Sequence, residues 1–251
     1  MPPPRASRPT DMYSKLKNVA RRAAGRPPAF VPRPPLVPAL EAVYQRLVCR
    51  DLARLQLDDI FYPVGSAANY GLFYVILRAV LEFPFARVVE LGAGQTSLLL
   101  DALARKQLLR AEVSTLEHDE QWATRIAARV GHGVMTVPLR ERSDAGICFA
   151  GYDLSAVQPG PIDFLSIDGP PAATVETQYS RLGALDLARS IDLTRFVIVI
   201  DDAERAGERL LADRMVAALQ GLGAAPAVGH IVANKRQIII AGGDYIGAAY
   251  Y

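Results

Sequence analysis

The pattern of apolar and polar positions along the chain predicts helices and strands in alternation. Apolar residues recur at helical spacing over residues 39–57 and again over residues 67–82. Short apolar runs follow, separated by further helical patterns, and the first of these runs begins at Val88. The other predicted strands are 112–117, 134–138, 162–167 and 196–200, and predicted helices lie near 120–130, 174–190 and 204–222. This alternation is typical of an α/β protein with a parallel sheet.

The end of the chain departs from this alternation. Two apolar runs, residues 227–232 and 237–240, are separated only by the short segment from Ala233 to Arg236. A crossover between parallel strands needs about a dozen residues or more, so these two strands are predicted to form a hairpin. The last strand is therefore expected to be antiparallel to its neighbours.

The strand that begins at Val88 leads into a motif suited to ligand binding. Glu90 ends the apolar run, and Gly92 and Gly94 form a Gly-x-Gly turn before a helical pattern. Glycines let the backbone approach a ligand, and the first N–H groups of the following helix are unpaired. A carboxylate entering the turn repels a diphosphate but suits the cationic amino group of S-adenosylmethionine. The motif therefore favours S-adenosylmethionine, and valine at either glycine is expected to abolish its binding while the protein still folds.

A nicotinamide dinucleotide is the alternative ligand. Its fingerprint, G-x-G-x-x-G/A, has glycine or alanine at the sixth position. This chain has Ser97 there, which counts against a nicotinamide dinucleotide. Further along, a second apolar strand ends at Glu117, which is placed to accept hydrogen bonds from ribose hydroxyls. Glu117, His118 and Asp119 can also simply begin the next helix, and the two roles are compatible.

Three carboxylates are predicted to meet at the carboxyl edge of the sheet. Asp168 follows one predicted strand, and Asp201 and Asp202 follow the next. Carboxylates this close repel one another, so a positive group is expected among them. A hard cation with oxygen ligands would meet this need. Pairing with Arg181 or Arg205, with no metal bound, is the alternative.

The composition is that of one globular domain with a tail. The chain has 251 residues, 51% of them hydrophobic, which is enough to bury a full core. No apolar run reaches the roughly 18–20 residues that span a bilayer. Cys49 and Cys148 lie far apart without metal-ligand spacing, so reduced thiols and a cytoplasmic location are expected.

Residues 1–38 are predicted to be a tail on a catalytic domain of residues 39–251. The tail holds eight Lys/Arg, one acid and ten of the 18 prolines, whereas the domain carries a net charge of −5. The acidic domain argues against a nucleic-acid groove. Residues 11–24 have the spacing of a short amphipathic helix. This helix would rest on a membrane surface or dock on a protein partner, and a solvated basic arm is the alternative.

Two segments are expected to bound the ligand site. The segment Phe61–Tyr70 mixes aromatic, turn-forming and small polar residues just before the motif strand, and it is expected to be a lid. Residues 140–160, which include Tyr152, are expected to be a long loop that forms a wall of the acceptor pocket. Ordinary loop packing is the alternative for both.

Over about residues 60–245 the chain resembles the class I S-adenosylmethionine-dependent methyltransferases. Within that superfamily it is similar to bacterial small-molecule methyltransferases of polysaccharide and natural-product pathways, through an Asp-Gly-Pro and an Asp-Asp-Ala-x-Arg sequence. The segments that carry the resemblance are Glu90–Gly94, Glu117–Asp119, Ile167–Pro171 and Ile200–Arg205.

This resemblance implies an α/β, Rossmann-like fold with a seven-stranded sheet in the order 3-2-1-4-5-7-6, the last strand antiparallel and helices on both faces. It also implies that the donor lies at the carboxyl edge of the sheet, with Glu117 at its ribose and His118 near its adenine. The donor-site residues that it implies are Glu90, Gly92, Ala93, Gly94, Thr96, Ser97, Glu117, His118 and Asp168.

The three acids also resemble the metal site of catechol and caffeoyl-CoA O-methyltransferases. This likeness implies that Asp168, Asp201 and Asp202 bind Mg²⁺ or another divalent cation. A catalytic lysine of those enzymes corresponds to Pro171 here, so another base or the metal itself would activate the acceptor. The candidate bases are Asp168, Asp202 and His230.

The expected activity is O-methylation of a hydroxyl group on a small molecule or a sugar or glycan precursor. Two alternatives stay open: a nicotinamide-dependent oxidoreductase, and a non-catalytic methyltransferase-like module that docks partners through its basic tail. Neither the acceptor nor the oligomeric state follows from the sequence.

Overall fold

The computed structural model describes residues 34–62, 68–157 and 160–251. Residues Pro34–Tyr251 form one compact unit. The predicted tail helix over residues 11–24 therefore lies outside the described residues. None of the helices described is long and apolar enough to cross a membrane.

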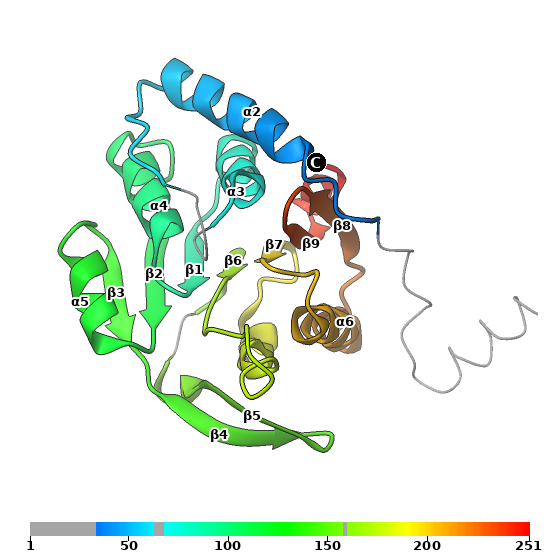
Figure 1. The fold of residues 1–251 in the computed structure, drawn as a ribbon. Coiled ribbons are helices and arrows are strands. Elements are labelled where there is room, and N and C mark those ends of the chain that lie inside the picture. Colours follow the sequence, from blue (N-terminus) through cyan, green and yellow to red (C-terminus); the bar gives the residue numbers. More distant parts are fainter. Residues whose placement is uncertain (1–33, 63–67, 158–159) are drawn as a thin grey trace, which may run out of the picture. The chain divides into compact units, whose positions relative to one another are not determined.

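The central element is a seven-stranded sheet in the order β3-β2-β1-β6-β7-β9-β8 (Figure 1). Counted along the chain within this sheet, the order is 3-2-1-4-5-7-6, which confirms the predicted Rossmann-like topology. Its strands are β1 (Arg87–Leu91), β2 (Glu112–Glu117), β3 (Gly133–Thr136), β6 (Phe164–Ile167), β7 (Arg195–Ile200), β8 (Ala227–Val232) and β9 (Arg236–Gly243).

The last two strands form the predicted antiparallel hairpin. β9 pairs antiparallel with β7, with Ile198 opposite Ile240, and with β8, with His230 opposite Ile238. The remaining neighbours in the sheet pair in parallel. The connection between β8 and β9 is too short for a crossover, so it imposes this direction.

Helices cover both faces of the sheet (Figure 1). On β7, Val197 and Val199 pack into the core beneath α3 (Tyr70–Glu82) and α4 (Gln95–Arg105), whereas Ile198 and Ile200 pack into the core beneath α6 (Ala206–Gly221). This alternation follows from the two-residue period of a strand buried on both faces. The α-helices are α2 (Leu40–Arg54), α3 (Tyr70–Glu82), α4 (Gln95–Arg105), α5 (Glu120–Ala127) and α6 (Ala206–Gly221), and η3 (Ile246–Tyr250) is a 3₁₀ segment.

The long loop expected over residues 140–160 is largely a β-hairpin, so that expectation was wrong. β4 (Leu139–Asp144) and β5 (Ile147–Tyr152) pair antiparallel and form a separate two-stranded sheet. Ala145 and Gly146 turn the hairpin with φ angles of 48° and 81°. Phe149 and Tyr152 are buried in the core on the α6 side, so Tyr152 does not line an acceptor pocket. The sequence pattern missed β4 because its residues are mostly exposed and polar.

The helix expected near residues 174–190 is a 3₁₀ segment, η2 (Ser180–Ser190). Thr174 and Thr177 close a preceding turn through their hydroxyl groups, 3.1 Å apart, which delays the start of helical structure. η2 then packs closely on β5, where a Cβ on Gly151 would lie 3.0 Å from the Ser180 carbonyl oxygen. It supplies Arg181 to the site described next.

Candidate functional site

A cavity of about 730 Å³ opens at the carboxyl edge of the sheet. It lies between the neighbouring strands β1 and β6. The connection from β1 to β2 crosses one face of the sheet and the connection from β6 to β7 crosses the other, which is the usual ligand position in open α/β sheets. Its volume falls in the range of roughly 300–1,000 Å³ that is usual for small-molecule sites. The lining residues are Tyr62, Ala68, Gly92, Ala93, Gly94, Gln95, Thr96, Glu117, His118, Asp119, Trp122, Asp168, Gly169, Pro170, Pro171, Ala172, Ala173, Arg181, Asp202 and Arg205.

The two glycines of the turn are needed for different reasons. Gly92 has a φ of +96°, and a Cβ there would lie 2.8 Å from the backbone nitrogen of Gly169. Gly94 has an extended φ of −179°, and a Cβ there would meet no atom within 4 Å. Valine at residue 92 would therefore strain the backbone, which corrects the expectation that this variant folds normally. Of the two glycines, Gly94 is therefore the one at which a substitution can test ligand binding without also straining the backbone.

The backbone amides of this turn are already hydrogen-bonded within the protein. Gly92 donates to the Leu116 carbonyl oxygen at 2.8 Å. Ala93 donates to Glu117 Oε2 and Gly94 donates to Ser97 Oγ, each at 2.9 Å. The turn thus offers few free donors to an anionic ligand.

Glu90 lies beneath the turn and is not among the residues that line the cavity. Its side chain is fully buried, and its carboxylate accepts hydrogen bonds from the hydroxyls of Thr96, Ser97 and Thr115. Burial raises the pKa of Glu90, although these hydrogen bonds oppose the rise. The contacts join β1 to β2 and to the first turn of α4, so Glu90 and Ser97 support the shape of the turn.

Glu117 faces the cavity from the end of β2. Its Oε1 accepts the backbone N–H groups of His118 at 2.7 Å and Asp119 at 3.0 Å. His118 Nδ1 also lies 2.7 Å from this oxygen. Among the described residues, Glu117 Oε2 accepts the Ala93 amide alone, so it retains capacity for a donor from a ligand.

Two aromatic residues line the cavity: Tyr62, which belongs to the segment expected to be the lid, and Trp122, which the sequence reasoning did not place at the site. Trp122 is 43% exposed and donates from Nε1 to the Ala93 carbonyl oxygen at 2.7 Å. Tyr62 is 73% exposed, and its backbone N–H and C=O bond the Gln95 side chain at 2.7 and 2.8 Å. Trp122 lies three residues after Asp119, the N-cap of α5, which turns the indole back toward the Gly-x-Gly turn.

The predicted lid is described only in part, because residues 63–67 lie outside the described residues. Tyr62 and Ala68 line the cavity on either side of them. Asn69 caps α3 by accepting the Leu72 N–H at 3.0 Å.

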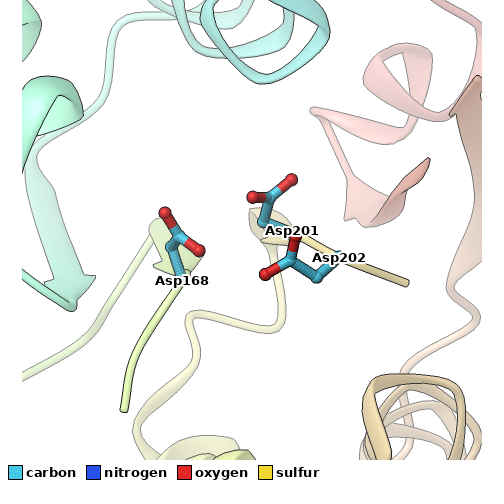
Figure 2. Close-up of side chains that lie close together, drawn as sticks. All are labelled: Asp168, Asp201 and Asp202. Carbon is cyan, nitrogen blue, oxygen red and sulfur yellow. The ribbon is translucent and has the colours of Figure 1, made fainter. Parts of the chain in front are cut away.

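Asp168, Asp201 and Asp202 come together as the sequence predicted (Figure 2). Asp168 follows β6, and Asp201 and Asp202 follow β7. The three acids meet because parallel neighbouring strands bring their carboxyl ends to one edge of the sheet. One carboxylate oxygen from each lies within 4.8 Å of the others. Asp201 is fully buried and Asp202 nearly so, whereas the Asp168 side chain keeps 20% of its surface exposed.

Cations and an amide surround these three carboxylates. Arg181 Nη2 lies 3.1 Å from both Asp168 Oδ1 and Asp202 Oδ2. The predicted pairing with arginine is therefore present, and Lys235, which the sequence reasoning missed, joins it. The remaining contacts are Arg205 Nη1 to Asp202 Oδ2 at 2.9 Å, Lys235 Nζ to Asp202 Oδ1 at 3.0 Å and to Asp201 Oδ2 at 3.4 Å, and Gln237 Nε2 to Asp201 Oδ1 at 2.6 Å.

The environment separates the titration of two of these acids. Burial and the neighbouring charge of Asp201 raise the pKa of Asp168 well above its usual range. Burial also acts on Asp202, but the charges of Arg181 and Lys235 outweigh it and lower its pKa. An acid that holds its proton to higher pH and a fixed anion thus lie side by side.

The donor set does not fit a bound divalent ion. Within the described residues, Asp168 Oδ2 is the one oxygen of the three carboxylates without a hydrogen bond or ion pair. Lys235 Nζ lies between Asp201 and Asp202, where a shared cation would bind. A dication would have to displace these cations, so the amino acids themselves supply the positive charge that the cluster requires.

Glu208, in the first turn of α6, extends the cluster. It is fully buried, with Oε1 3.6 Å from Arg181 Nη1 and 3.7 Å from Arg205 Nη1. These separations are too long for hydrogen bonds. Burial therefore dominates and raises the pKa of Glu208 to about 7.

Glu208 should make the stability of the protein depend on pH. Because its pKa is raised on folding, the folded state binds more protons than the unfolded state between about pH 4.5 and pH 7. The free energy of unfolding should fall across this window by up to about 3 kcal/mol. Urea denaturation at pH 5 and pH 8 should show a lower free energy of unfolding at pH 8 for the wild type, and no such decrease for Glu208→Gln. An equal pH dependence in the variant would contradict the assignment.

His230 lies in β8 and is not among the residues that line the cavity. Cys49 and Cys148 are both free.

The comparisons with known proteins give only distant likenesses. No family model and no curated protein matches the chain. A methyltransferase from Pyrococcus furiosus is 18% identical, with a TM-score of 0.44, over 81% of this chain and 96% of that chain. The SAH-bound methyltransferase PaMTH1 of Podospora anserina is 12% identical, with a TM-score of 0.44, over 96% and 100%. The O-methyltransferase from Bacillus cereus, in complex with SAH, is 16% identical, with a TM-score of 0.38, over 93% and 99%. Similarity this low assigns no activity to the chain.

Proposed function

We propose that this protein is an S-adenosylmethionine-dependent methyltransferase that methylates a hydroxyl group of a small molecule, such as a sugar or glycan precursor. One observation carries the proposal. A single cavity at the carboxyl edge is lined by Gly94 and the Glu117 carboxylate at its β1–β2 end, and by the Asp168 carboxylate at its β6–β7 end. The first end suits a nucleoside donor and the second suits a proton leaving an acceptor.

The state of the turn favours this donor over a nicotinamide dinucleotide. The amides of Gly92, Ala93 and Gly94 are already hydrogen-bonded within the protein, so the turn itself offers no free backbone donor to a diphosphate. The Glu117 carboxylate bonded to the turn would also repel a phosphate. A sulfonium and an amino group gain from the acidic lining instead. Glu90 does not line the cavity, so Glu117 rather than Glu90 supplies the carboxylate that disfavours a diphosphate.

We assign the donor subsites residue by residue. Glu117 Oε2 would accept a ribose hydroxyl, and the turn at Gly92 and Gly94 would hold the methionine part. His118 and Trp122 would flank the adenine, since Trp122 is fixed to Ala93 with its ring partly exposed. Ala93 and Thr96 complete the lining of the turn.

Asp168 is the residue we assign as the general base. The acceptor oxygen attacks the methyl carbon of the donor, the carbon–sulfur bond breaks, and its electron pair stays on sulfur as a neutral thioether. The hydroxyl proton passes to Asp168, whose Oδ2 has no partner among the described residues. The sulfonium is already a strong methyl donor. Aligning the acceptor oxygen with the methyl carbon therefore accounts for much of the expected rate acceleration. The buried Arg181, which also pairs with Asp202, holds Asp168 in place.

We expect no metal requirement, in contrast to the metal-assisted alternative that the sequence left open. Millimolar magnesium should not raise the melting temperature of the protein, and a chelator should not weaken donor binding. Differential scanning fluorimetry and calorimetry measure both effects. A magnesium-dependent rise in melting temperature that Asp202→Asn abolishes would show that the acid cluster binds the metal.

Calorimetric titration with S-adenosylhomocysteine and with NAD⁺ tests the donor assignment. We expect saturable binding of S-adenosylhomocysteine and none of NAD⁺ at the same concentrations. The reverse result would favour the oxidoreductase. Binding of neither would favour the non-catalytic module, in which deletion of the basic tail should abolish partner binding.

A further inference from the structure

The acceptor end of the cavity presents one exposed cation. Among the described lining residues, Arg181 and Arg205 are the basic side chains of the Lys/Arg type. The Arg181 side chain is 5% exposed and fully engaged with acids, whereas the Arg205 side chain is 32% exposed. The neighbouring wall, from Pro170 to Ala173, is small and apolar. A ligand that enters this end therefore meets Arg205 as its polar contact beside Asp168.

The guanidinium of Arg205 is held in place but only partly used. Asp202 adopts the left-handed region, with a φ of 54°, and its carbonyl accepts the Arg205 N–H at 3.0 Å. Nη1 pairs with Asp202 Oδ2 at 2.9 Å and lies 3.7 Å from Glu208. Nε and Nη2 have no hydrogen bond or ion pair within the part of the chain that the structure describes. Two donors of a fixed fork are thus available.

The charge of Arg205 is also only partly neutralised. Asp202, its nearest anion, is shared with Arg181 at 3.1 Å and with Lys235 at 3.0 Å. Arg205 pairs with Asp202, Asp202 pairs with Arg181, and Arg181 pairs with Asp168. This chain of ion pairs keeps the Arg205 guanidinium near the proposed base.

We propose that Arg205 determines acceptor specificity by binding an anionic group, a carboxylate or a phosphate, carried a few bonds from the methylated hydroxyl. This inference rests on the proposed function, because it assumes that the acceptor hydroxyl lies at Asp168. A planar guanidinium fork with two free donors matches either oxyanion in a bidentate manner. The acceptor is then an acidic hydroxylated small molecule rather than a neutral one.

Inorganic phosphate and acetate serve as probes of this subsite. Each is titrated calorimetrically into the full-length protein, with and without saturating S-adenosylhomocysteine. We expect millimolar binding of at least one anion in both states, and at least tenfold weaker binding to Arg205→Gln. Arg205→Lys should retain part of the affinity. Arg54→Gln, which changes an exposed arginine on α2, is the matched control and should bind like the wild type.

The outcomes separate this inference from the proposed function. Arg205→Gln should fold, because Asp202 keeps Arg181 and Lys235, and an unchanged melting temperature checks this. The inference fails if the wild type binds neither anion or if Arg205→Gln binds them equally well. It also fails if S-adenosylhomocysteine displaces the anion, since Arg205 would then bind the donor carboxylate. If anion binding depends on Arg205 but S-adenosylhomocysteine does not bind, the anion subsite stands and the methyltransferase assignment falls. The relative affinities for phosphate and acetate indicate which oxyanion the acceptor carries.

Discussion

Gly94→Val is expected to weaken the binding of S-adenosylhomocysteine by at least about 100-fold, equivalent to about 2.7 kcal/mol, while leaving the melting temperature unchanged. Gly94 lines the cavity, has extended backbone, and would place a Cβ in open space. The branched side chain would therefore occupy volume that we assign to the methionine part of the donor. Calorimetry of wild type and variant measures the effect.

Two further glycine variants make this result specific. Gly133→Val is the matched control, because Gly133 is exposed on β3, has open space around its Cβ and does not line the cavity. It should bind S-adenosylhomocysteine like the wild type. Gly92→Ala should instead lower the melting temperature, since its Cβ meets the backbone of Gly169. Unchanged donor affinity in Gly94→Val would remove the turn from the donor site.

Arg181→Met is expected to destabilise the protein by about 3–5 kcal/mol, the cost of breaking a buried ion pair from one side. The variant keeps an unbranched side chain of similar length but leaves Asp168, Asp202 and Glu208 without their shared cation. It also removes hydrogen bonds to the carbonyl oxygens of Asp168 and Asp201, at 2.7 and 3.1 Å. Urea denaturation at pH 7 measures the loss.

Arg142→Met provides the comparison for an exposed pair. Arg142 bonds both oxygens of Asp186, at 2.6 and 2.7 Å, but both side chains are partly exposed. Such pairs contribute less than about 1 kcal/mol, so this variant should be nearly neutral. Equal, small effects of the two substitutions would mean that another cation neutralises the acid cluster, and the metal hypothesis would return.

The topology could be predicted because it depends on local patterns. Apolar runs that alternate with helical periodicity favoured the parallel sheet, and the short connection between β8 and β9 imposed the antiparallel end. The same reasoning placed Asp168 beside Asp201 and Asp202, since residues that follow parallel strands share one edge. Glu117 at the cavity followed from its position at the end of β2.

The parts that were missed depend on tertiary contacts. Lys235 reaches the acid cluster from the β8–β9 connection, and nothing in its local sequence marks it as a partner of Asp202. Glu90 has the spacing of a ligand contact, but hydroxyls from α4 and β2 enclose it. The β4–β5 hairpin escaped notice because strand pairing and one buried face stabilise it, whereas its own β4 sequence is polar.

A crystal structure of the full-length protein with S-adenosylhomocysteine tests the proposed donor site most directly. We expect the ligand in the cavity at the carboxyl edge, with a ribose hydroxyl hydrogen-bonded to Glu117, its homocysteine part against Gly94, and its sulfur facing Asp168. A ligand bound elsewhere, or bound in this cavity without contact to Glu117 and Gly94, would contradict the assignment.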